Sequence, residues 1–149
     1  MPHFTLQVSP QGLLVIAFVG VSDARRQTLS AANEQVPTPQ QVSALIDTGA
    51  SDTCVDPAVL NALGLSPTGA ATVNTPTTGT NPQIQDQYDV SLFIPGATAT
   101  DLPLVITALP VISSELLAAM GFHALIGRDV LSRCLLAYNG TMRHFTIAY

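Results

Sequence analysis

Short apolar segments separated by closely spaced turn residues are the feature that most restricts the fold of this chain. Several of these segments alternate apolar with polar residues, as half-buried strands do. The glycines and prolines, ten and eleven in number, fall mainly between the segments and mark turns. Many short strands joined by turns are typical of a closed or sandwiched β fold. We therefore expect a mostly β protein with two or three short helices.

The same pattern predicts the individual elements. An N-terminal hairpin (strands 4–8 and 13–19 around the turn 10–12) is followed by a polar connection over 22–40. The expected strands after it are 42–46, 88–94, 104–109 and 124–126, and residues 72–81 form a loop or hairpin tip. The expected helices are 57–63, one beginning at Ser113 or Ser114 and ending before Gly121, and 128–134. A final hairpin spans 135–147, where Asn139-Gly140 favours a type I′ turn.

Length and charge restrict the class of protein. A chain of 149 residues without an internal repeat or a linker predicts one domain over 1–149. Charged residues make up only 10%, hydrophobic residues 47%, and the net charge is −5. So acidic a chain lacks the basic surface that binds nucleic acid or an anionic membrane. So apolar a chain predicts that part of its surface is buried against a partner.

The cysteines and the first apolar run bear on localisation. Cys54 and Cys134 are far apart in sequence, and we interpret them as free, buried thiols. The run 13–21 has no Lys or Arg before it and follows a turn, so it predicts a strand and not a signal peptide. It is also too short to span a bilayer. We expect a cytoplasmic protein that does not bind membranes.

Two segments carry the candidate chemistry. In the first, the apolar residues 44–46 lead directly into Asp47-Thr48-Gly49-Ala50-Ser51, which places a carboxylate at the end of a strand. In the second, the apolar residues 124–126 lead into Gly127-Arg128-Asp129 and the start of a helix. No serine-hydrolase or nucleotide-binding motif is present. The three histidines have no ligand spacing, so we predict no metal and no cofactor.

These two segments resemble the signature segments of the retropepsin-like aspartic proteases. The resemblance extends over 42–140, with the glycine-bearing stretch 75–81 where that family has its flap. It implies a dimeric acid-protease β-barrel that hydrolyses peptide bonds. A single Asp-Thr-Gly in the chain implies that Asp47 is catalytic and that a second copy supplies the other carboxylate. Two carboxylates held close together share one proton and act as acid and base.

The resemblance also implies roles for the neighbours of Asp47. Thr48 and Gly49 would support the active site, and Gly49, Ala50 and Asp52 would contact a peptide or protein substrate. The flap residues Thr77, Thr78 and Gly79 would close over that substrate.

One position departs from the pattern. Retroviral members usually have Asp where this chain has Ser51, and that Asp pairs with the arginine that corresponds to Arg128. We assign Arg128 a structural role, and Asp129 a role at the start of a helix and not in catalysis. The alternative to a protease is a catalytically silent dimer of the same fold that acts as a peptide-binding or dimerisation module.

Overall fold

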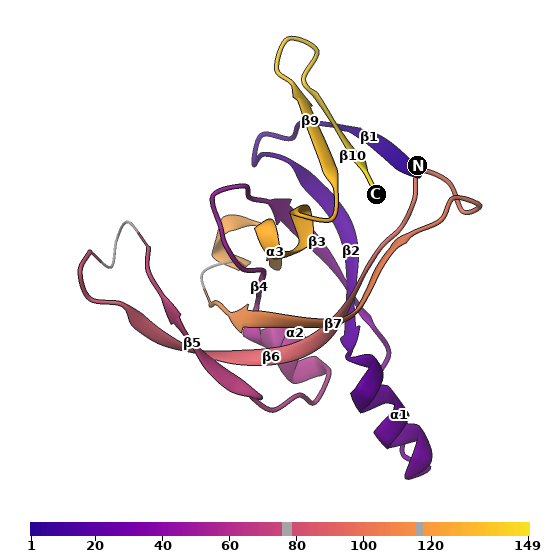
Figure 1. Ribbon diagram of the computed structural model, residues 1–149, viewed down its shortest axis with the longest axis vertical. Helices are drawn as coiled ribbons and strands as arrows, with labels where there is room; N and C mark the ends of the chain where they lie inside the picture. Colours follow the sequence, from indigo (N-terminus) through magenta and orange to yellow (C-terminus); the bar gives the residue numbers. More distant parts are fainter. Residues whose placement is uncertain (76–78, 116–117) are drawn as a thin grey trace.

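The computed structural model describes residues 1–75, 79–115 and 118–149, and it confirms a mostly β fold (Figure 1). The strands are β1 (His3–Gln7), β2 (Leu14–Val21), β3 (Gln40–Ile46), β4 (Cys54–Val55), β5 (Gly69–Val73), β6 (Gln83–Ile94), β7 (Leu104–Ser113), β8 (Ala124–Ile126), β9 (Leu135–Asn139) and β10 (His144–Ala148). The helices are α1 (Asp23–Ala31), α2 (Pro57–Ala62) and α3 (Arg128–Leu131), with a 3₁₀ turn at Ala118–Met120.

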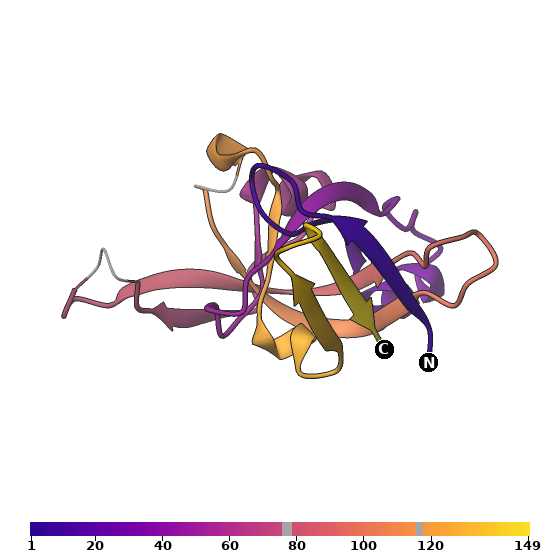
Figure 2. The same cartoon turned by 90° about the horizontal axis from the view of Figure 1, so that it is seen from above.

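A closed barrel forms the body of the molecule. Its strands follow the order β2-β3-β8-β4-β7-β6, and pairing of β6 with β2 closes the ring. Within the described residues β5 pairs with β6 alone, and the two strands form a hairpin that projects away from the barrel (Figure 2). A separate sheet of order β1-β10-β9 lies beside the barrel.

The apolar alternation that predicted strands also builds the core. Every second residue of β2, for example Val15, Ala17 and Val19, is buried, as the two-residue period of a strand requires. Buried residues of β3, β6 and β8 and three of β7 (Ile106, Leu109 and Val111) join the same cluster, together with Leu60 of α2 and Phe145 of β10. One continuous core therefore connects the barrel, α2 and the separate sheet.

The predicted helix over 57–63 is confirmed as α2. The Asp56 side chain caps it by accepting a hydrogen bond from the backbone N–H of Ala58, and Gly64 follows with a φ of 63°. A helix was predicted to begin at Ser113 or Ser114 and to end before Gly121. Ser113 instead belongs to β7, and the described residues before Gly121 form a 3₁₀ turn at Ala118–Met120. Residues 116–117 lie outside the described part of the chain. No described helix is long and apolar enough to cross a membrane.

The prediction of a polar connection over 22–40 was wrong in its first half. Residues 23–31 form α1, which the side chain of Ser22 caps by accepting from the backbone N–H of Arg25. Asp23 forms an ion pair with Arg26 and accepts from Gln27, which supports the first turns. Only Leu29 is buried, so the helix lacks the apolar period that signals helices in a sequence.

Two predicted hairpin features were also wrong. Residues 9–12 do form a tight turn, but β1 pairs with β10, whereas β2 pairs with β3 and β6. Both edges of β2 are used by the barrel, so β1 has no edge of β2 to join. The β9–β10 hairpin is confirmed, yet its turn is not type I′, because neither Asn139 nor Gly140 has a positive φ. In the loop between β9 and β10, the residue with a positive φ is Arg143, at 53°.

Candidate active site

Two strands that are far apart in the sequence bring the two motif segments together. β3 and β8 run parallel, with Leu45 opposite Leu125 and Ile46 opposite Ile126. The backbone N–H of Asp47 continues this pairing and donates to the carbonyl of Ile126 at 3.0 Å. Since parallel strands end at the same edge of a sheet, Asp47 and Gly127 emerge side by side.

The Asp47 carboxylate is half-buried and fixed by its own loop. Its Oδ1 accepts a hydrogen bond from the backbone N–H of Gly49 at 2.7 Å. A Cβ at position 49 would lie 3.0 Å from that same oxygen, so glycine permits the close approach. The carbonyl of Asp47 accepts from the N–H of Ala50 at 3.3 Å, which closes the turn.

Arg128 holds the Asp47 loop from the second segment. Its Nη1 donates to the carbonyls of Thr48 at 3.1 Å and Gly49 at 3.3 Å, and its Nη2 donates to the Ser51 hydroxyl at 2.9 Å. Ser51 therefore binds the Arg128 guanidinium through a hydrogen bond, at the position where retroviral members of the family usually have an aspartate that forms an ion pair. Arg128 thereby connects the second segment to the Asp47 loop.

A second connection between the segments passes through Thr53, which the sequence analysis did not single out. Thr53 is 1% exposed, and its hydroxyl donates to Oδ1 of Asp129 at 2.8 Å and accepts from the N–H of Gly127 at 3.2 Å. The backbone N–H of Thr53 donates to Oδ2 of the same carboxylate at 2.9 Å. Asp129 also accepts from the N–H of Val130, so it stabilises the start of α3 as predicted.

Gly127 lies directly against the Asp47 loop. A Cβ at this position would come within 2.7 Å of the backbone C and O atoms of Asp52. Only glycine permits the two segments to pack this closely. In the sequence, the only indication of this contact was the glycine that directly follows β8. The residue against which it packs could not be predicted.

The two cysteines are free, as predicted, but half-buried. Burial first, and then the nearby carboxylates of Asp52, Asp129 and Asp47, raise the pKa of the Cys54 thiol to about 11. Burial also raises the pKa of Cys134. Within the described residues no group of three or more His, Cys, Asp or Glu is placed to hold a metal ion.

The structure places the predicted substrate-contacting residues in two regions. Gly49 and Asp52 are exposed and Ala50 is half-buried, all on the loop that carries Asp47. Gly79, with a φ of 57°, lies near the tip of the β5–β6 hairpin, which projects from the barrel in both views (Figures 1 and 2). Thr77 and Thr78 lie outside the described residues.

Comparisons with known proteins agree with this geometry. A family model described as aspartyl protease matches residues 27–136. The crystal structure of a retropepsin-like aspartic protease from Rickettsia conorii is similar, with a TM-score of 0.59 and 15% identity over 97% of this chain and 89% of that one. The resemblance of folds therefore covers almost the whole of both chains.

A weaker similarity is to the foamy viral protease-reverse transcriptase solved with an RNA/DNA hybrid. Its TM-score is 0.45 at 18% identity, over 80% of this chain and 12% of that one. A search of curated protein sequences found no match.

Proposed function

This chain belongs to the aspartyl protease family, and from that premise we propose that it is an endopeptidase whose active site forms between two copies. Each copy contributes Asp47, and the two carboxylates activate a water molecule that attacks the peptide bond. The observation that carries this proposal is the placement of Asp47, on a loop that Arg128 and Thr53 fix from both sides. The chain contains one Asp-Thr-Gly, so the second carboxylate must come from another molecule.

The chemistry follows from two carboxylates that share one proton. The ionised carboxylate removes a proton from the water, and the protonated one donates to the oxygen of the scissile carbonyl. The resulting tetrahedral intermediate collapses when the leaving nitrogen is protonated, and the peptide bond breaks. Asp129 is not available for this chemistry because its carboxylate is engaged by Thr53 and Val130.

The exposed loop around Asp47 supplies the substrate contacts. Among the described residues the Gly49 carbonyl accepts one long bond, from Arg128 at 3.3 Å, and a carbonyl oxygen has two lone pairs. It can therefore accept a second hydrogen bond from a peptide N–H. Ala50 and Asp52 form the subsite walls beside it, and Thr48 supports the loop at the interface of the two copies.

The β5–β6 hairpin is proposed to serve as the flap. Its described residues pair with the barrel through β6, and the hairpin projects away from the barrel (Figure 2). Closure of such a hairpin over a bound peptide excludes water from the reaction.

The test is the substitution Asp47→Asn. Asparagine preserves the size of the side chain and an oxygen that accepts from Gly49, but an amide cannot act as the base. Cleavage of an unfolded protein such as casein should fall by about 10²–10⁴-fold, the contribution of a positioned general base. Glu34→Gln, which removes one charge at an exposed site remote from the loop, serves as the matched control.

The same variant tests the two-chain site. If nine parts of Asp47→Asn chain are mixed with one part of wild type, most wild-type chains enter mixed dimers, and activity per wild-type chain should fall to about one tenth. Undiminished activity of a folded Asp47→Asn protein would refute the assignment. A wild type that binds pepstatin, the inhibitor expected for this family, but never cleaves would indicate the silent peptide-binding alternative.

A further inference from the structure

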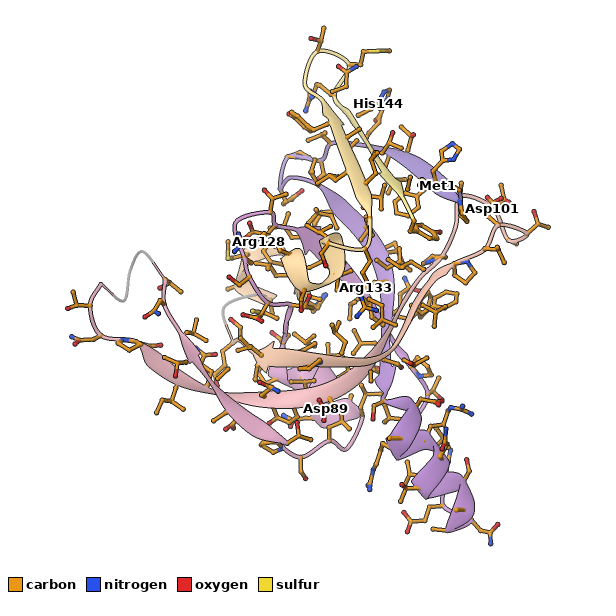
Figure 3. All side chains as sticks on the ribbon, viewed as in Figure 1. Met1, Asp89, Asp101, Arg128, Arg133 and His144 are labelled. Carbon is orange, nitrogen blue, oxygen red and sulfur yellow. The ribbon has the colours of Figure 1, made fainter. Side chains whose placement is uncertain are left out.

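The turn between β9 and β10 contains the single Asn-Gly pair of the sequence. β9 ends at Asn139, Gly140 follows, and the loop continues to Arg143. Residues 137–143 are all exposed, and the tip of this hairpin lies at the end of the molecule opposite α1 (Figure 1). In Figure 3 the labelled His144, the first residue of β10, lies close to the tip. The fold therefore leaves the Asn-Gly pair open to water.

An asparagine and the residue after it can react with each other without an enzyme. The side-chain carbonyl carbon of asparagine lies within reach of the next backbone nitrogen, and attack by that nitrogen closes a cyclic imide. A Cβ on the following residue crowds this approach, and glycine has none. Asparagine is accordingly counted among the thermolabile residues of proteins. Asn139 and Gly140 are the pair of this chain best suited to the reaction.

The turn leaves both reacting groups ready. Oδ1 of Asn139 accepts a hydrogen bond from the backbone N–H of Met142 at 3.0 Å, which polarises the side-chain carbonyl and makes its carbon more electrophilic. The N–H of Gly140 donates to no acceptor within residues 1–75, 79–115 and 118–149. No hydrogen bond within that part of the chain therefore has to break before this nitrogen attacks.

We propose that Asn139 is a site of spontaneous modification, where the folded protein loses ammonia and gains a carboxylate. Water takes the proton of the Gly140 nitrogen, this nitrogen bonds to Cγ of Asn139, and the bond from Cγ to Nδ2 breaks. The leaving nitrogen takes up a proton and departs as ammonia. A water molecule then opens the imide. Opening at Cγ gives aspartate, whereas opening at the main-chain carbonyl gives isoaspartate, whose backbone has an additional CH2 group.

The surroundings of Asn139 favour the new negative charge. All ten acidic residues lie between Asp23 and Asp129, so β1, β9 and β10 contain none. Arg143 lies in the same loop. A carboxylate at position 139 therefore meets no like charge within its own sheet. In the aspartate form the hydrogen bond from the N–H of Met142 becomes charge-assisted, which preserves the turn.

The modification changes a definite surface of the molecule. Asn139, Gly140 and His144 line an open hollow of about 590 Å³ on the sheet, together with Thr5, Ala137, Tyr138 and Thr146. Either product places a negative charge there. Isoaspartate also lengthens the backbone where Asn139 lies opposite His144, the last pair between β9 and β10. We therefore expect the amides at the hairpin tip to exchange faster with solvent in the isoaspartate form.

The test is to age the folded protein at mildly alkaline pH and to map its peptides by mass spectrometry. The peptide that contains Asn139 should show the replacement of NH2 by OH, the intact protein should gain one negative charge in ion-exchange chromatography, and isoaspartyl methyltransferase should label the same peptide. The other asparagines are internal controls, because they are also exposed but are not followed by glycine, and they should keep their amides: Asn33, Asn61, Asn74 and Asn81. Asn81 precedes Pro82, which has no N–H to react.

Gly140→Ala is the matched variant. Gly140 does not have a positive φ, and an added Cβ would lie 3.2 Å from the Tyr138 ring, which a small shift of the ring accommodates. This variant should lose ammonia more slowly than wild type. Asn139→Gln, in which ring closure would need a larger ring, should also resist, and circular dichroism checks that both variants are folded.

Two results would overturn the proposal. One is an Asn139 that keeps its amide in the folded protein but loses it in urea, which would show that the turn protects the pair. The other is a folded Gly140→Ala that loses ammonia as fast as wild type. Neither measurement involves peptide cleavage, so the outcome is independent of the protease assignment.

Discussion

At the scale of single residues, the position of the candidate catalytic carboxylate depends on neighbours that take no part in the chemistry. Asp47 is attached to β8 by one backbone hydrogen bond, but its loop is held by Arg128 and by the buried pair of Thr53 and Asp129. Gly127 adds close packing against the loop backbone. We expect substitutions at these positions to affect stability first and activity as a consequence.

Thr53→Val tests this dependence. Valine fits the same space but leaves the N–H of Gly127 without its acceptor and removes the hydroxyl donor to Oδ1 of Asp129, which keeps its bonds from the backbone N–H groups of Thr53 and Val130. An unsatisfied buried group of this kind costs about 1–3 kcal/mol, and the free energy of unfolding in urea should fall by that amount. Thr141→Val, at an exposed loop position, should stay within about 0.5 kcal/mol of wild type. Equal stability of the two variants, measured at one protein concentration, would show that the Thr53 hydroxyl does not hold the loop.

At the scale of elements, the β5–β6 hairpin differs from the rest of the sheet. β6 is buried where it belongs to the barrel, at Val90 and Leu92, whereas its first part and all of β5 are exposed or half-buried. An element with few buried contacts opens at low cost, and a binding loop benefits from that freedom.

Hydrogen exchange on binding pepstatin tests the proposed flap. Amides of 69–73 and 83–87 should exchange quickly in the free protein and more slowly when the inhibitor is bound, because the hairpin closes over it. Amides of 90–94, within the barrel, provide the internal control and should be protected in both states. Pepstatin that inhibits cleavage but leaves exchange of 69–73 and 83–87 unchanged would contradict a flap.

At the scale of the whole molecule, the proposed active site exists only when two chains meet. The rate of cleavage should then depend on pH as a bell, with its maximum on the acid side of neutrality, because only the singly protonated pair of carboxylates is active. The pH dependence of kcat/KM for a fluorogenic peptide measures this profile. A rate that stays constant into the alkaline range would exclude a paired-carboxylate mechanism.

The thiol of Cys54 does not account for the fall in the cleavage rate at alkaline pH. Burial and the nearby carboxylates raise the pKa of Cys54 to about 11, so its thiol remains protonated throughout the range in which the carboxylate pair titrates. Cys54→Ser should therefore leave the shape of the profile unchanged. Loss of the alkaline limb in that variant would assign the limb to the thiol.

The sequence by itself determined the elements with a strong local signal. Short apolar or alternating segments predicted β2, β3, β6, β7 and β8 of the barrel, although not the two-residue strand β4, and Asp56-Pro57 with Gly64 predicted α2, because these signals act within a few residues. The two motif segments also predicted the family and pointed to Asp47, since a carboxylate at the end of an apolar strand is a local feature.

Only the tertiary structure decided which strands are neighbours and what holds the Asp47 loop. Local pattern placed β1 in a hairpin with β2, but closure of the barrel uses both edges of β2 and leaves β1 to pair with β10. The α1 helix, polar on most of its surface, gave no periodic signal. The contact of Thr53 with Asp129 joins residues that are 76 positions apart. Pairing between distant segments depends on the packing of the whole chain, and no short stretch of sequence contains it.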